Sequence, residues 1–195
     1  MISVIVPVYN EEETLPALFE RLLPVMDALK RPSEVIFVND GSRDASLPLL
    51  LQEYKKRPDI VKVLDLNGNF GQHMAIMAGF KAAKGDIVIT MDADLQNPPE
   101  EIPRIVACID EGHDVVGTIR LHRKDTLFRR TASRIVNWLT NRITGLTLHD
   151  YGCMLRGYRR DIVDIINEAG ETATFIPALA QKFSVNPIEI EVAHS

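Results

Sequence analysis

Cysteine is scarce in this sequence, which has only Cys108 and Cys153 among its 195 residues. So few cysteines exclude a disulfide framework, and the lack of a CxxC pair argues against structural zinc. Basic residues are also in the minority, with 22 Lys and Arg against 27 Asp and Glu and a net charge of -5. This acidic balance argues against nucleic acid as a partner. The scarcity of cysteine fits a reduced, cytoplasmic setting.

Long apolar runs are missing as well. None approaches the roughly 20 residues that span a bilayer. The opening "MISVIVPV" is too short for a secretory signal and lacks a basic start. There is no GxxxxGK[ST] loop, no GxGxxG and no HExxH, which excludes the common ATPase, dinucleotide and zinc-protease sites. If the protein meets a membrane, we expect this chain to do so from one side only.

What the sequence does contain is a regular alternation of two kinds of segment. Nearly continuous Val- and Ile-rich runs are typical of strands covered on both faces, and helical patterns separate them. The alternation predicts an α/β three-layer sandwich with a mainly parallel sheet. The expected strands are Ile2–Val8, Glu34–Asn39, Val61–Leu66, Asp86–Met91 and Asp114–Thr118. The expected helices are Thr14–Lys30, Ala45–Lys56, Gln72–Ala83 and Pro99–Glu111.

The regular alternation of expected strands and helices ends after Thr118. A helical pattern over Thr126–Thr144 is followed by the segment "HDYGCMLRGYRR", a helix near Asp161–Glu168 and a last strand, Ile188–Val192. We interpret residues 1–195 as one domain. Its first part, 1–118, resembles a nucleotide-binding unit, and its second part, 119–195, is more specialised.

Polar clusters follow four of the expected strands, where ligands of open α/β sheets bind. Each alone is weak evidence, since a sequence such as Asp-Gly-Ser is more often a turn with a helix cap. Four at successive strand ends predict one crevice. The clusters are "PVYNEEE" (7–13), "NDGSRD" (39–44), "NGNFGQ" (67–72) and "DADLQ" (92–96).

Asp92 and Asp94 place two carboxylates one residue apart after an apolar strand. Like charges this close repel unless a cation lies between them. Carboxylate oxygens, with the Gln96 amide as a third donor, suit Mg²⁺ or Mn²⁺ that shares its shell with phosphates. Alone, such a pair is more often a solvated loop, but its place in the crevice favours a metal carrying a diphosphate. Haloacid dehalogenase phosphatases also have this pair, but there it follows the first strand of the core, whereas here it follows the fourth expected strand.

Cations gather in one short stretch, "RLHRKDTLFRRTASR" (120–134), with six Lys and Arg against Asp125 alone. Arg129 and Ser133 are four residues apart, hence on one face of the expected helix, where both can hold the same phosphate. A solvated basic face is the plainer interpretation. Beside an anionic membrane the stretch is also attracted to the surface, by about 1 kcal/mol per residue.

Together these motifs resemble the family 2 glycosyltransferases of the GT-A fold. The segments "VIVPVYNEEE", "VNDGSRD", "GQHMAIMAGF" and "DADLQNPPEEIP" carry the resemblance to the family. The segments "DVVGTIR", "RRTASR" and "DYGCMLRGYRR" are similar to its polyprenyl-phosphate group, that of the dolichyl-phosphate mannose synthases. The resemblance covers essentially the whole chain.

The resemblance implies a role for individual residues. It implies a nucleoside pocket lined by Pro7, Tyr9, Glu11 and Asp40, with Asp40 near the base. It implies that Gly71 lets the backbone approach the nucleotide. The implied Mg²⁺ or Mn²⁺ ligands are Asp92, which also serves the nucleotide, Asp94 and Gln96. For the two phosphate-bearing substrates, it implies that Arg120 grips the donor diphosphate and that the acceptor phosphate is held by Arg129 and Ser133.

An acceptor phosphate needs no general base, because it is already anionic at neutral pH (second pKa about 6). The protein then aligns two anions and stabilises the leaving diphosphate, and in-line displacement inverts the anomeric centre. A hydroxyl acceptor would instead need a base. Asp150 stands where many members carry such an Asp, so a hydroxyl-acceptor transferase stays open. A non-catalytic nucleotide-sugar-binding protein is the third interpretation.

The resemblance also implies the partners, a nucleoside diphosphate sugar, UDP-linked rather than GDP-linked, and a polyprenyl phosphate at the cytoplasmic face of the cell membrane. Relatives in this group continue into interfacial and transmembrane helices that this sequence does not contain. Whether the protein is a homo-oligomer stays open.

Overall fold

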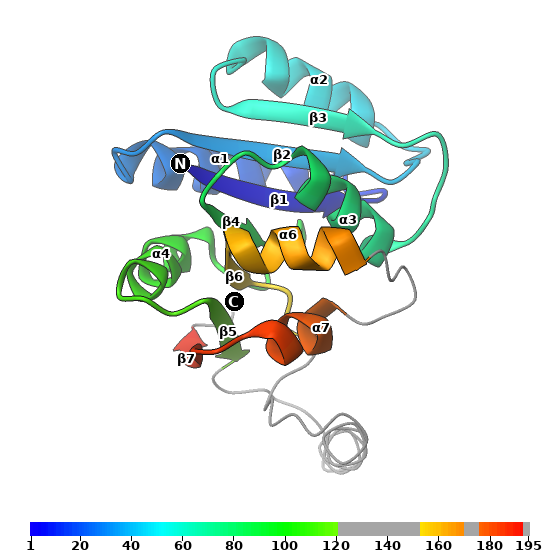
Figure 1. The fold of residues 1–195 in the computed structure, drawn as a ribbon. Coiled ribbons are helices and arrows are strands. Elements are labelled where there is room, and N and C mark those ends of the chain that lie inside the picture. Colours follow the sequence, from blue (N-terminus) through cyan, green and yellow to red (C-terminus); the bar gives the residue numbers. More distant parts are fainter. Residues whose placement is uncertain (121–152, 170–175, 193–195) are drawn as a thin grey trace, which may run out of the picture.

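The computed structural model describes residues 1–120, 153–169 and 176–192 (Figure 1). In chain order the strands and helices of this part are β1 (Ile2–Val8), α1 (Leu15–Ala28), β2 (Ser33–Asn39), α2 (Ser46–Lys56), β3 (Val61–Asp65), α3 (Gln72–Ala82), β4 (Ile87–Thr90), the 3₁₀ turn η1 (Pro99–Glu101), α4 (Ile102–Asp110), β5 (Val115–Arg120), β6 (Arg156–Arg159), α6 (Arg160–Ala169), α7 (Ile176–Phe183) and β7 (Pro187–Val192). No helix in these three ranges is long and apolar enough to cross a bilayer.

One mixed sheet organises the described residues, in the order β3-β2-β1-β4-β6-β5-β7. The first four strands run parallel, with Val4 of β1 opposite Val35 of β2 and Ile89 of β4. β6 is antiparallel to both of its neighbours, β4 and β5, and β7 runs parallel to β5. The prediction of a mainly parallel sheet in an α/β sandwich is therefore confirmed.

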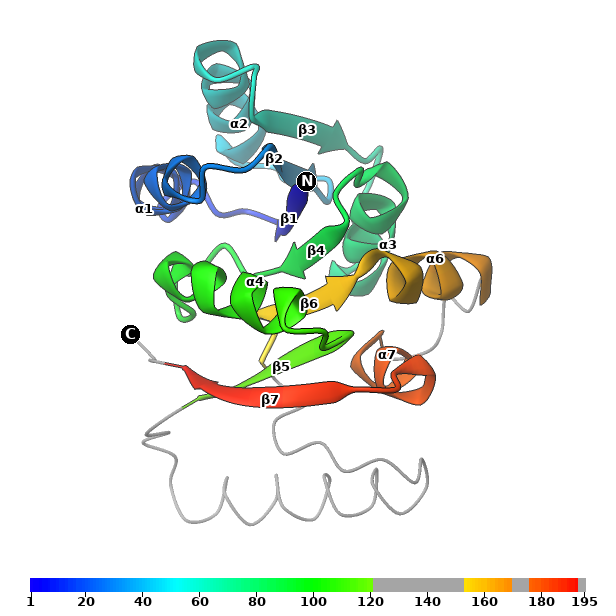
Figure 2. The same cartoon turned by 60° about the vertical axis from the view of Figure 1, so that its left-hand side comes forward.

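Helices cover both faces of the sheet. Figure 2 shows α1, α2 and α4 on one side and α3, α6 and α7 on the other. In β1, alternate residues serve the two layers: Val4 and Val6 belong to the core beneath α1 and α4, and Ile5 to the core beneath α3 and α6. Strands buried on both faces have to be apolar almost throughout, which explains why the sequence revealed them so clearly.

Two described elements, β6 and α7, were missed by the sequence prediction. β6 has the sequence "RGYR", which carries no apolar alternation. Its first residue, Arg156, is nevertheless 1% exposed, and the Tyr158 ring packs edge-on against Phe80 at 5.5 Å. β6 is thus a strand because its backbone pairs with β4 on one side and β5 on the other, and not because of a local sequence pattern. The helix expected over Thr126–Thr144 lies outside the described residues.

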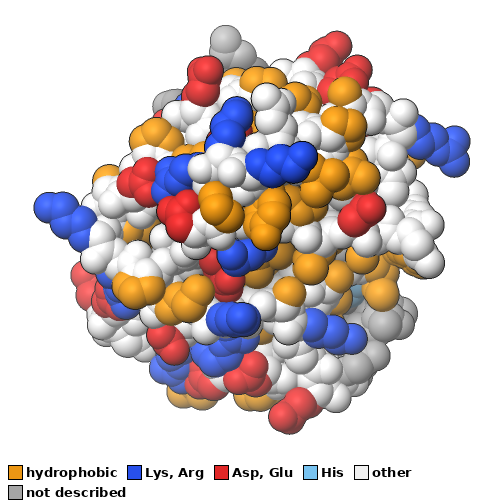
Figure 3. Space-filling model, turned by 90° about the horizontal axis from the view of Figure 1, so that it is seen from above, with side chains coloured by type: hydrophobic (Ala, Val, Ile, Leu, Met, Phe, Trp, Pro, Cys, Tyr) orange, Lys and Arg blue, Asp and Glu red, His pale blue; other side chains and the backbone are white. Residues whose placement is uncertain are grey.

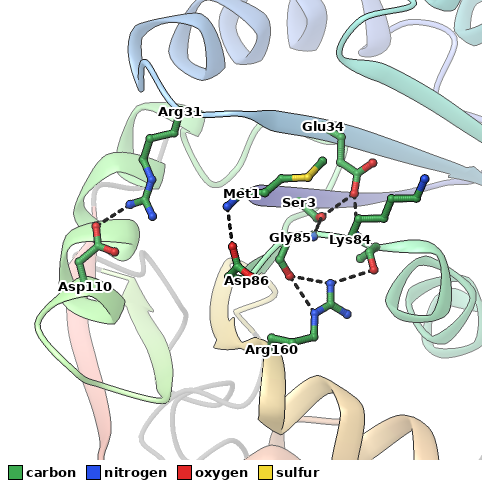
Figure 4. Close-up of polar contacts among 10 residues, drawn as sticks. Met1, Ser3, Arg31, Glu34, Lys84, Gly85, Asp86, Asp110 and Arg160 are labelled. Atoms are coloured by element: carbon green, nitrogen blue, oxygen red, sulfur yellow. Dashed lines mark hydrogen bonds and ion pairs between the residues drawn. The ribbon is translucent and has the colours of Figure 1, made fainter.

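A network of hydrogen bonds closes the amino-terminal end of the sheet (Figure 4). The buried Glu34 carboxylate accepts hydrogen bonds from the Ser3 hydroxyl at 2.7 Å and the Lys84 backbone N–H at 2.8 Å. The Gly85 N–H donates to Ser3 Oγ at 2.8 Å, and Arg160 donates to the Gly85 carbonyl at 2.6 Å. These bonds join β1, β2, the approach to β4 and the start of α6. The opposite end of the sheet is left for binding.

Candidate functional site

A cleft of about 740 Å³ lies at the carboxyl ends of β1, β2 and β4. Ligands bind at this edge in open α/β sheets. Residues that follow β3 and precede β6 complete its wall. The lining residues are Pro7, Val8, Tyr9, Glu11, Asp40, Asn69, Gly71, Gln72, Asp92, Ala93, Asp94 and Met154.

The loops after β1 and β2 are bonded to each other, which fixes the first wall of the cleft. Asn10, at φ 56°, donates its N–H to Ser42 Oγ at 3.0 Å and accepts the Arg43 N–H at 2.8 Å. The Glu11 N–H donates to Ser46 Oγ at 2.8 Å. Because Tyr9 and Glu11 flank Asn10, these bonds hold both residues at the cleft.

Asp44 reinforces the same pair of loops. Its carboxylate accepts the N–H groups of Glu12 at 3.1 Å and Ser46 at 3.0 Å, while Glu12 accepts the Ala45 N–H at 2.7 Å. Partial burial raises the pKa of Asp44, but the bonds from Ser46 and Glu12 outweigh it and keep that pKa below its usual range. The carboxylate is therefore ionised at neutral pH, as an acceptor of several N–H groups should be.

Asp40 holds the loop that leads into α3. It is 2% exposed, and its two oxygens accept the backbone N–H groups of Phe70 and Gly71, each at 2.8 Å. Gly71 has φ +90°, a conformation that favours glycine, and it caps α3. Gly41 allows the two loops to touch, since a Cβ there would lie 2.5 Å from the Gly68 carbonyl carbon.

The turn after β4 carries the two predicted metal carboxylates. Asp92 is half-buried, and its Oδ1 accepts a hydrogen bond from Gln72 Nε2 at 2.7 Å. Asp94 is exposed, and its Oδ1 accepts the Gln96 N–H at 3.0 Å. Leu95, between Asp94 and Gln96, has φ 60°, so the backbone turns sharply at this point. Both carboxylates line the same cleft.

Within the described residues, no three His, Cys, Asp or Glu side chains are grouped to hold a metal ion by themselves. Of the four carboxylates that line the cleft in the described part of the chain, Asp92 and Asp94 lie together in the turn after β4, and no imidazole or thiolate of the kind that zinc prefers lines it there. Hard oxygen donors in this number fit Mg²⁺ or Mn²⁺, which keep several positions for water and substrate phosphates. The donor set is therefore compatible with the expected ion.

A buried polar contact anchors the far end of this turn. Asn97, 2% exposed, accepts a hydrogen bond from Cys153 Sγ at 3.2 Å. The Cys153 sulfur lies 2.8 Å from Thr118 Oγ1, and that hydroxyl bonds the Leu155 carbonyl at 2.7 Å. The turn after β4, the end of β5 and the approach to β6 are thus joined at one point.

The sequence model of the family described as "Glycosyl transferase family 2" matches residues 3–166. The chain belongs to glycosyl transferase family 2. Among curated relatives, the undecaprenyl-phosphate 4-deoxy-4-formamido-L-arabinose transferase of Photorhabdus laumondii is 52% identical over all of this chain and 60% of its own length. The protein of that name from Salmonella choleraesuis is 50% identical, over 59% of its length. The chain therefore spans about three fifths of these relatives.

Solved structures with the same fold include more distant proteins. Glucosyl-3-phosphoglycerate synthase from Mycobacterium tuberculosis, in complex with Mn²⁺, UDP and glucosyl-3-phosphoglycerate, has a TM-score of 0.68 at 20% identity and covers all of this chain and 72% of its own. S. aureus TarS 1-349 has a TM-score of 0.65 at 23% identity, covering 97% of this chain and 57% of its own. The GT-A fold expected of family 2 is confirmed.

Seven of the residues expected from the family 2 resemblance line the one cleft: Pro7, Tyr9, Glu11, Asp40, Gly71, Asp92 and Asp94. Gln96 lies in the same turn but is not among the lining residues. Arg120 is the last residue of β5. Arg129, Ser133 and Asp150 lie outside the described residues, so their roles stay predictions.

Five cleft residues had no predicted role: Val8, Asn69, Gln72, Ala93 and Met154. Asn69 and Gln72 belong to the "NGNFGQ" cluster, so the pattern of polar residues after strands had already indicated their region. Met154 reaches the cleft because β6 runs antiparallel, which brings its start to the same edge; Thr90 Oγ1 donates to the Met154 carbonyl at 2.8 Å.

A second hollow, of about 460 Å³, lies at the free edge of β3. Figure 3 looks down on α2 and this edge and shows apolar side chains interspersed with Lys and Arg. Leu51 and Tyr54 are 43% and 41% exposed there, and Lys62 and Lys84 also line the hollow. Its one buried charge, Glu34, already holds Ser3 and the Lys84 N–H. This hollow is therefore a weaker candidate for a functional site than the cleft.

Proposed function

We propose that this protein is an inverting, metal-dependent glycosyltransferase that moves a sugar from a nucleoside diphosphate to a polyprenyl phosphate. The observation that carries the proposal is the meeting of Asp40, Asp92 and Asp94 in one cleft at the carboxyl edge of the sheet. Relatives about 52% identical over the whole chain, named as undecaprenyl-phosphate transferases, support the acceptor class.

The first part of the chain binds the donor in this proposal. Pro7, Tyr9 and Glu11 receive the nucleoside, and Tyr9, 44% exposed, offers a ring for contact with the base. Asp40 lies beside them, near the base. A Cβ at Gly71 would meet nothing within 4 Å and would point into open space. Because glycine has no Cβ, that space stays open to the nucleotide. UDP is the proposed nucleotide, because relatives of the fold are solved with it.

A divalent cation, Mg²⁺ or Mn²⁺, would supply positive charge for the leaving diphosphate when bound. Asp92, Asp94 and Gln96 would hold it. Mn²⁺ in the solved complex of the mycobacterial synthase supports this choice. Arg120, at the end of β5, adds a second positive charge for the same diphosphate.

The second part of the chain binds the acceptor. Arg129 and Ser133 hold its phosphate and bring it behind the anomeric carbon. The positive charge of Arg129 offsets the repulsion between this phosphate and the donor diphosphate. The phosphate oxygen then attacks directly, the bond from the anomeric carbon to the diphosphate breaks, and the configuration inverts. Asp150 orients the acceptor or a neighbouring arginine. The reaction takes place at the cytoplasmic face of the membrane, where the basic stretch 120–134 meets anionic lipid.

Calorimetry of the purified chain tests the donor half. We expect UDP to bind more tightly than GDP, and more tightly with Mn²⁺ than in excess chelator. Asp94→Ala should remove the difference between metal and chelator. Equal UDP affinity under both conditions in the unmodified chain would contradict the metal-dependent proposal.

Transfer of labelled sugar to undecaprenyl phosphate in detergent micelles tests the acceptor half. The relatives' name makes the UDP form of 4-deoxy-4-formamido-L-arabinose the first donor to try. Arg129→Ala should abolish transfer and leave UDP binding intact, and Asp150→Asn should cost less. Loss mainly through Asp150→Asn would favour a hydroxyl acceptor. UDP-sugar binding without any turnover would instead indicate a non-catalytic nucleotide-sugar-binding protein.

A further inference from the structure

Gln72 makes a side-chain contact across the cleft that the proposed function leaves without a role. Its Nε2 donates to Asp92 Oδ1 at 2.7 Å, although the two residues are 20 positions apart. Gln72 is the first residue of α3, whereas Asp92 lies in the turn after β4. Both line the cleft. The contact therefore joins two separate walls of the site.

The backbone beneath Gln72 is fixed in place. Gly71, which precedes it, donates its N–H to the buried carboxylate of Asp40 and starts α3 at φ +90°. The first turn of the helix closes on the Gly71 carbonyl, which accepts the N–H groups of Met74 at 3.0 Å and Ala75 at 3.1 Å. The Gln72 side chain therefore extends from a rigid support, and its amide reaches Asp92 from a defined direction.

An amide suits this position for an electrostatic reason. It fixes the orientation of a carboxylate through a neutral hydrogen bond, so it does not itself neutralise the negative charge of Asp92. A lysine at the same place would offset that charge, and a glutamate would add to the repulsion. Groups that bond a metal-binding carboxylate in this way typically change metal affinity about 10- to 100-fold when they are removed.

From these contacts we infer that Gln72 is a positioning residue that orients Asp92 toward the metal and diphosphate of the donor. The inference rests on the proposed function, because it assigns Asp92 to that metal. It adds a link from Asp40 at the end of β2, through the start of α3, to Asp92 at the end of β4. The wall of the cleft that carries Asp40 and the wall that carries Asp92 are then positioned by one chain of contacts.

The test is a titration of UDP binding with Mn²⁺, by calorimetry, for the unmodified chain and Gln72→Met. Methionine has a similar length but no N–H to donate. We expect Gln72→Met to raise the Mn²⁺ concentration needed for UDP binding about 10-fold, at the lower end of the usual range because the contact is exposed. UDP affinity in excess chelator and the melting temperature should not change. Gln52→Met, an exposed glutamine on α2, is the matched control and should match the unmodified chain.

A second arm separates positioning from direct contact with the donor. In an Asp92→Asn background, Gln72→Met should have no further effect, because the carboxylate that it orients is gone. Equal loss of UDP affinity with and without metal, additive effects of the two substitutions, or no effect of Gln72→Met would each overturn the inference. Failure of the proposed metal dependence would appear separately, as metal-independent UDP binding by the unmodified chain, and would remove the inference with it.

Discussion

Replacing Asp40 by Asn tests whether this residue builds the cleft before any nucleotide arrives. In the structure its carboxylate is 2% exposed and accepts two backbone N–H groups at 2.8 Å, from Phe70 and Gly71. The asparagine oxygen can accept one of these N–H groups. Its NH₂ group must then face the other donor, so one bond is lost and a buried N–H is left without an acceptor.

The expected cost follows from that geometry. A hydrogen bond to a charged group contributes about 1.5–3 kcal/mol net, and an unsatisfied buried donor costs a similar amount. We therefore expect Asp40→Asn to lower the free energy of unfolding by about 2–3 kcal/mol. For a domain of this size, that corresponds to a melting temperature lower by about 4–12 °C. Asp40→Ala, which removes both bonds, should lower it further.

Thermal unfolding followed by circular dichroism, without nucleotide, gives the answer. Asp164→Asn removes an exposed carboxylate of α6 whose ion pair with Arg160, at 3.6 Å, contributes little, so it should lower the melting temperature far less. If Asp40→Asn melts at the same temperature as the unmodified chain but loses UDP binding, then Asp40 serves the base alone and the structural reasoning is wrong.

Two further predictions concern stability away from the cleft. Gly85→Ala should cost about 1–3 kcal/mol in urea unfolding, because its Cβ would lie 2.6 Å from a backbone nitrogen of β1; Gly68→Ala, whose Cβ meets only a side chain at 3.7 Å, should cost little, and equal losses would contradict the argument. Burial raises the pKa of Asp114, but bonds from the α7–β7 turn outweigh it and hold that pKa below its usual range. This stabilisation is present above the usual aspartate pKa and is lost as pH falls through the lowered value. Asp114→Asn should therefore be less stable than the unmodified chain at pH 7 and approach its stability in acid. Urea midpoints measured from pH 7 to pH 3 test this, and a constant difference between the two proteins would contradict it.

The sequence predicted the first 118 residues well because their strands are buried on both faces. β1 was predicted with the bounds that the structure has, Ile2–Val8, and the other five predicted strands differ by one or two residues at one or both ends. β6 could not be predicted in this way, since "RGYR" becomes a strand only between β4 and β5. Neither could the sheet order, because no local pattern says which strands will be neighbours.

The cleft shows the same division. Polar clusters after strands predicted which loops would meet, and Asp40, Asp92 and Asp94 do line one cleft. The bond from Gln72 to Asp92 was not predictable, because it depends on how α3 sits against the turn after β4. The two hydrogen bonds that Phe70 and Gly71 donate to the Asp40 carboxylate likewise depend on the close approach of two loops that only the folded backbone reveals.

The contact between Thr118 and Cys153 has a consequence for how such a protein can change. Thr118, near the end of β5, and Cys153, just before β6, touch beside Asn97. The side chains of Thr118 and Cys153, and the pairing of Val115 with Tyr158, therefore join β5 and β6 directly, on the two sides of residues 121–152. Under the proposed function, a change of sequence within 121–152 would alter the acceptor that the enzyme uses and leave Asp40, Asp92 and Asp94 in their cleft.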